Sequence, residues 1–108
     1  MSRLNFVPSV HRDWSTLRIG SRSVHVTGWA IVGNQSLSSE SLAQHIITQA
    51  QSGQSISRIL SGIDGNFAVV FEAQDRLFLG VDIIRSIPLF YRNSGNTLMV
   101  SDDIRSIY

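Results

Sequence analysis

The chain has 108 residues, which suffices for one small domain and is too short for two of ordinary size. Nine arginines, no lysine and eight acidic residues give a formal net charge of +1, which argues against a non-specific nucleic-acid binder, because such a protein needs a concentrated basic field. The absence of cysteine excludes disulfides, thiolate nucleophiles and cysteine-ligated metal sites. The sequence has neither an apolar run of roughly 18 residues nor a signal-peptide pattern, so we expect a soluble, cytoplasmic protein without membrane contact.

Three strands are predicted in the first third of the chain. A short strand-like segment occupies residues 4–7, and residues 14–19 alternate loosely between apolar and polar side chains. Residues 22–32 are rich in β-branched side chains, and the glycine–serine pair before them is typical of a hairpin turn. Residues 34–41 are polar and rich in serine, which predicts a loop leading into a helix.

The hydrophobic period changes to that of a helix after this loop. Ser39 is the expected N-cap, and Glu40 in the first turn favours the helix dipole. A second short helix is predicted from Ile56 and ends at Gly62 or Gly65. The apolar stripe of the first helix comprises Leu42, Ala43, Ile46, Ile47 and Ala50.

The second half of the chain returns to strand patterns. Residues 66–72 are apolar on both faces, which predicts a strand that is covered on both sides. Residues 76–82 form the returning strand, and residues 88–91 and 97–100 make a second hairpin. Residues 101–104 are expected to cap and begin a terminal helix. Together these elements predict a single α+β domain over residues 1–108.

Three of the C-terminal segments carry a family resemblance. Residues 63–71, Ile-Asp-Gly-Asn-Phe-Ala-Val-Val-Phe, resemble the L-x-G-x-F-A-F-x-L strand of class II glutamine amidotransferase domains, which are the N-terminal-nucleophile hydrolase domains of asparagine synthetases. Residues 76–91 resemble the family's R-L-F-L-A-R-D-x-x-G-x-x-P-L-Y-Y with the same Asp-to-Pro spacing, and residues 98–102 resemble its L-x-F-A-S-E. The resemblance implies a truncated fold derived from the αββα sandwich, with antiparallel β-sheets and two or three short helices.

The positions that carry catalysis in this family are not matched here. An active member begins with a cysteine whose own α-amine acts as the base, whereas this chain has Ser2 after the initiator methionine. The family's Asn-Gly oxyanion dipeptide corresponds to Thr27-Gly28, and no counterpart of the glutamine-binding Arg and Asp is found. We therefore expect no catalytic residue and no cofactor, with Ser2 as the one remaining catalytic candidate.

Other polar residues are expected to be structural. The three histidines, His11, His25 and His45, lie on different predicted elements without acidic residues at ligand spacing, so we expect no metal site. Asp102 and Asp103 are expected to form a helix N-terminus and to have no further role.

The candidate interface follows the returning strand, in the region that, by the resemblance, lies near the synthetase domain of asparagine synthetases. Its residues are Asp82, Arg85, Pro88, Phe90 and Tyr91. We predict a non-catalytic amidotransferase-like accessory domain or subunit. It would dock onto an ATP-dependent asparagine synthetase-like, amide-forming enzyme, in the biosynthesis of a natural product or modified peptide. The strand at 66–72 adds a physical argument, because cover for both its faces would come from a partner chain or, in a homo-oligomer, from a second copy.

Two other functions stay open. One is an amidohydrolase that uses Ser2 as its N-terminal nucleophile. The other is a module that binds a peptide substrate by adding it to an exposed sheet edge.

Overall fold

A computed structural model describes residues 3–10, 12–73, 76–81, 87–94, 97–103 and 105. They form an α+β fold with mainly antiparallel sheets and two helices, which confirms the predicted class. The elements are β1 (Arg3–Phe6), β2 (Trp14–Ile19), β3 (Arg22–Val32), β4 (Gln35–Leu37), α1 (Ser39–Gln51), α2 (Ile56–Ser61), β5 (Asp64–Ala73), β6 (Arg76–Val81), β7 (Phe90–Ser94) and β8 (Thr97–Ser101).

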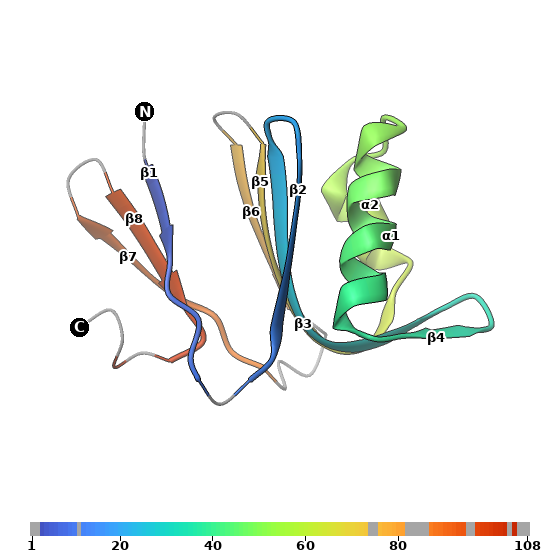
Figure 1. The fold of residues 1–108 in the computed structure, drawn as a ribbon, viewed down its shortest axis with the longest axis horizontal. Coiled ribbons are helices and arrows are strands. Elements are labelled where there is room, and N and C mark those ends of the chain that lie inside the picture. The colour runs from blue at the N-terminus through green and yellow to red at the C-terminus, as the bar shows by residue number, and fades with distance from the viewer. Residues whose placement is uncertain are drawn as a thin grey trace.

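The strands form two sheets, which we call the large sheet and the small sheet. The large sheet has the order β2-β3-β5-β6, with β4 paired to β3, and all its neighbours are antiparallel. The small sheet has the order β1-β8-β7, and β1 runs parallel to β8. Figure 1 shows the resulting three layers: the small sheet, the large sheet and the two helices.

Strand β5 lies at the centre of this arrangement and is buried on both faces. Phe67, Val69 and Phe71 belong to the core cluster that includes the apolar stripe of α1. Ala68 and Val70 point to the opposite face, toward the small sheet, and are fully buried. The predicted two-sided cover is confirmed. The expectation that a partner chain or a second copy supplies this cover is wrong, because the helices and the small sheet of the chain itself supply it.

Several boundaries differ from the sequence prediction; the strand predicted at residues 88–91, for example, is β7 at Phe90–Ser94. Ser38 rather than Ser39 is the N-cap of α1, while the Ser39 hydroxyl lies 2.8 Å from that of Ser15. The predicted loop at 34–41 contains β4, whose three residues pair with the end of β3. Strand β4 contains one apolar residue, Leu37, so its sequence has no hydrophobic period. It can be recognised only from its pairing with β3. Strand β5 also begins two residues earlier than predicted.

The aromatic contacts of Phe6 fix how the two sheets are stacked. Its ring centroid lies 4.7 Å from that of Trp14 on β2 and 4.7 Å from that of His25 on β3, so β1 packs over the β2 and β3 side of the large sheet. Since the small sheet has the order β1-β8-β7, its other edge, β7, lies toward β6. We call the β1 and β2 edge the closed side of the sandwich and the β6 and β7 edge its open side.

Candidate functional site

A buried carboxylate joins the two sheets at the closed side. Asp102, directly after β8, is 4% exposed. It accepts hydrogen bonds from the Ser9 amide (2.7 Å) and hydroxyl (2.8 Å), the Trp14 indole (3.2 Å) and the Arg12 guanidinium (3.1 Å). These contacts hold the connection between β1 and β2 against the end of the small sheet.

The donors around Asp102 keep it ionised. Burial alone would raise the pKa of this carboxyl, but the bonds from Ser9, Trp14 and Arg12 outweigh burial and leave the pKa below its usual value. The expectation that Asp102 only caps a helix is wrong. The local turn is made instead by Asp103, which accepts a bond from the Arg105 amide (3.0 Å). A carboxylate that accepts bonds from four donor groups is suited to fixing geometry rather than to transferring protons.

The positions that resemble the family's catalytic machinery serve as structural elements. Ser2 lies outside the described residues. Thr27 is buried within β3 and donates its hydroxyl proton to the Asp13 carbonyl at 2.8 Å. Gly28 has a φ of 102° and packs its backbone against that of Asn66 on β5. Both residues of the dipeptide are therefore committed to contacts within the large sheet.

Of the two described histidines, His25 is the one that packs between the sheets. Its Nδ1 lies 2.8 Å from the Thr16 hydroxyl and its ring stacks on Phe6. His45 lies half-buried on α1, and His11 is outside the described residues. Within the described ranges, no three histidine, aspartate or glutamate side chains gather where they could hold a metal ion.

We expect protonation of His25 to destabilise the fold. Burial, and secondarily the positive charge of Arg18, lower its pKa below the ordinary 6.5. The folded state therefore favours the neutral ring, so stability is full above about pH 6.5 and falls as the pH drops from there toward the folded pKa. Urea unfolding at a series of pH values should show a shallower acid loss in His25→Gln than in the wild type. His45→Gln, which removes a histidine on α1, is the matched control. Equal slopes in His25→Gln and the wild type would contradict the prediction.

The predicted interface residues lie along the open side where they are described. Asp82 and Arg85 fall outside the described residues. Pro88 and Phe90 are half-buried, and Tyr91 is 65% exposed. Tyr91 is in register with Val100, which pairs in turn with Phe6, so it belongs to the inner face of the small sheet.

Leu79 on β6 is the counterpart of Tyr91 on the large sheet. It pairs with Val70, so it points toward the small sheet, yet it is 37% exposed. Sequence reasoning missed this residue because its segment had the ordinary pattern of a returning strand. Two large apolar side chains on inner faces are thus open to solvent at one side of the sandwich. Neither β6 nor β7 has a further strand partner among the described residues.

No helix in the described part of the chain is both long and apolar enough to cross a membrane.

The comparisons with known proteins identify no relative. No family model, curated protein or solved structure matches the chain, so the resemblance to the asparagine synthetase amidotransferase domain stays a prediction.

Proposed function

We propose that this chain is a non-catalytic, amidotransferase-like accessory domain or subunit that docks, by its open side, onto an ATP-dependent amide-forming enzyme of the asparagine synthetase type. The observation that carries the proposal is the exposure of Leu79 and Tyr91 on the inner faces of the two sheets. Inner faces of a β-sandwich normally form its core, so exposed apolar residues there favour burial by a partner.

The chemistry of the open side suits a protein partner. Tyrosine is enriched at interfaces because its ring buries a large apolar area while its hydroxyl keeps a polar contact. The edges of β6 and β7, which have no further strand partner within the described ranges, also carry backbone donors and acceptors that a partner segment could pair. Phe90, half-buried beside Tyr91, alternates to the outer face of the small sheet, so Leu79 and Tyr91 carry the inner-face contact.

The kind of partner is proposed from the family resemblance. The segments that resemble the amidotransferase domain include β5, β6 and β8, and the residues between β6 and β7 are those that adjoin the synthetase domain in that family. The non-catalytic assignment is supported by Thr27 and Gly28, which are used for packing at the position of the family's oxyanion dipeptide.

Affinity purification from the native host, with mass spectrometry and a solution mass, tests the proposal. We expect the wild type to recover an enzyme that cleaves ATP to AMP and pyrophosphate, and Tyr91→Asp to recover at least tenfold less of it, since a buried unpaired carboxylate costs several kcal/mol. Val10→Asp is the matched control, because Val10 is 94% exposed but lies near the closed side. It should recover the enzyme at the wild-type level.

Other experimental outcomes would favour a different function or a different occupant of the open side. Ammonia release from glutamine that is lost after blocking of the N-terminal amine would favour the Ser2 amidohydrolase. A stable dimer that Tyr91→Asp dissociates would place a second copy on the open side. A monomer that recovers no ATP-dependent enzyme would overturn the proposal.

A further inference from the structure

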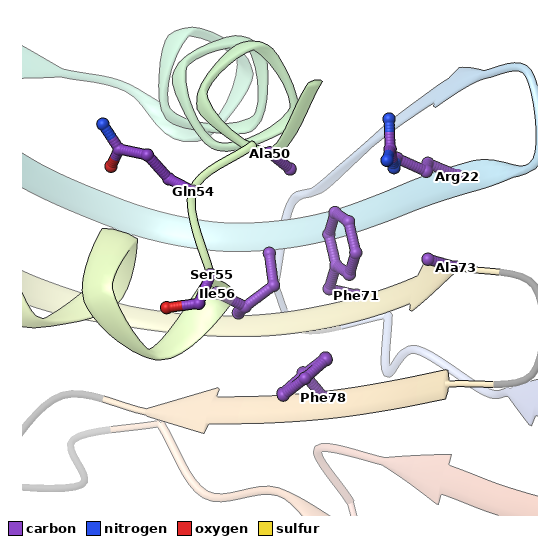
Figure 2. A pocket seen from close by; sticks show the side chains of 8 residues that line it. All are labelled: Arg22, Ala50, Gln54, Ser55, Ile56, Phe71, Ala73 and Phe78. Carbon is purple, nitrogen blue, oxygen red and sulfur yellow. The ribbon is translucent and has the colours of Figure 1, made fainter. Parts of the chain in front are cut away.

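A cavity of about 240 Å³ opens on the helix side of the large sheet, away from the open side of the sandwich. It lies where the turn between α1 and α2 crosses β3, β5 and β6. Figure 2 shows the ring of Phe71 between Ile56 and Arg22, with Phe78 on the neighbouring strand. The inference drawn from this cavity is independent of the proposed function.

The floor of the cavity is formed by closely packed apolar side chains. Phe71 and Ile56 are 2% and 5% exposed, and Ala50 from the end of α1 is also buried. The rings of Phe71 and Phe78 meet edge to face with their centroids 6.5 Å apart. Phe71 is almost completely covered, so the half-buried ring of Phe78 presents the aromatic surface to a flat or branched apolar group, and its edge-to-face contact with Phe71 holds its geometry.

Among the described side chains that line the cavity, Arg22 is the cationic one, and it lies at the rim of this apolar surface. Arg22 pairs with Ala73 in the β3 and β5 register, and both line the cavity from the helix-facing side of the sheet. Of the described residues that line the cavity, none is acidic, and the described ion pairs do not involve Arg22. Gln54 also lines the cavity, but its amide points away from Phe71 and Arg22 in Figure 2.

Size and charge together define a ligand class. The volume is below the roughly 300–1,000 Å³ common for drug-sized ligands, which limits the occupant to about the size of an amino acid. A guanidinium forms paired, charge-assisted hydrogen bonds with a carboxylate. We infer that this cavity binds a small aromatic or branched aliphatic carboxylate, with the apolar group against Phe78 above the buried Phe71 and the carboxylate on Arg22.

A neighbouring cavity of about 220 Å³ beside α2 does not offer the same combination. Its lining includes the polar side chains of His45, Gln49, Gln54 and Arg58, and the described residues around it include no phenylalanine. This contrast makes Arg58 the matched control for Arg22, since it is an exposed arginine outside the aromatic cavity but close to it.

The test is a titration of the isotope-labelled full chain, followed by amide NMR, with 3-phenylpropionate as the probe. We expect saturable shifts at residues that line the cavity, and at least tenfold weaker binding of 3-phenylpropanamide, which lacks the charge, and of acetate, which lacks the ring. Arg22→Gln should weaken 3-phenylpropionate binding about tenfold or more, Arg22→Lys less, and Arg58→Gln less than twofold.

Thermal unfolding of each variant verifies that it is folded before it is titrated. Should Arg22→Gln fail to fold, Arg22→Lys and the amide probe give the same comparison. Non-saturable shifts, equal binding of the acid and its amide, or equal effects of the Arg22 and Arg58 variants would overturn the inference.

Discussion

Replacing Asp102 by asparagine is expected to lower the free energy of unfolding by about 3 kcal/mol, near the lower end of the range for breaking a buried ion pair. The carboxylate side chain is fully buried, whereas Arg12 is 33% exposed and can regain water once the pair is lost. Asparagine keeps the size of the side chain, but its amide nitrogen would face the hydrogen-bond donors of Ser9 and Trp14. Urea unfolding at neutral pH measures the difference.

The effect of this substitution should depend on pH. The folded pKa of Asp102 lies below the ordinary value of 3.8, so the ionised form stabilises the fold fully above that value. This contribution is lost as the pH falls from about 3.8 through the folded pKa. The gap between the wild type and Asp102→Asn should therefore narrow below about pH 4.

The neighbouring carboxylate provides the control for Asp102. Asp103 pairs with Arg105, whose side chain is 80% exposed, and exposed pairs contribute less than about 1 kcal/mol. Asp103→Asn should thus change stability only slightly. Equal losses in Asp102→Asn and Asp103→Asn would contradict the assignment of Asp102 as the link between the sheets.

Replacing Gly28 by alanine is expected to cost about 3 kcal/mol or more. Its φ of 102° is a conformation that residues with a side chain rarely adopt, and an added Cβ would overlap the Asn66 carbonyl on the adjacent strand. Neither strand can move aside easily, because β3 and β5 are paired over ten residues from Arg22↔Ala73 to Ile31↔Asp64. Thermal and urea unfolding measure the loss.

Gly33 separates the two causes of this loss. It has a φ of 62° in the turn before β4, but an added Cβ there would meet no atom within 4 Å. Gly33→Ala should carry only the conformational cost, about 1 kcal/mol. A loss in Gly28→Ala no larger than that in Gly33→Ala would mean that close strand approach is not what requires glycine at position 28.

The candidate interface was only partly predictable. Tyr91 was named from the resemblance, and its 65% exposure fits a contact residue. The sequence does not indicate Leu79, because the residues of β6 do not show which of their side chains will lie at an uncovered edge of the sheet. The aromatic cavity was not predicted either, since Arg22, Ile56 and Phe78 are far apart in the chain.

The sequence by itself determined the local elements. Hydrophobic period identified α1 through its stripe from Leu42 to Ala50, and the double-sided apolar run identified β5 as a strand covered on both faces. Only the tertiary structure decided that Asp102 is a buried link rather than a cap, that β4 exists, and that the sandwich is closed at β1 and β2 but open at β6 and β7. The reason is that the hydrophobic period of a segment depends only on residues within a few positions of one another in the chain. The partners of Asp102 lie some 90 residues away in the chain, so their meeting depends on how the two sheets stack.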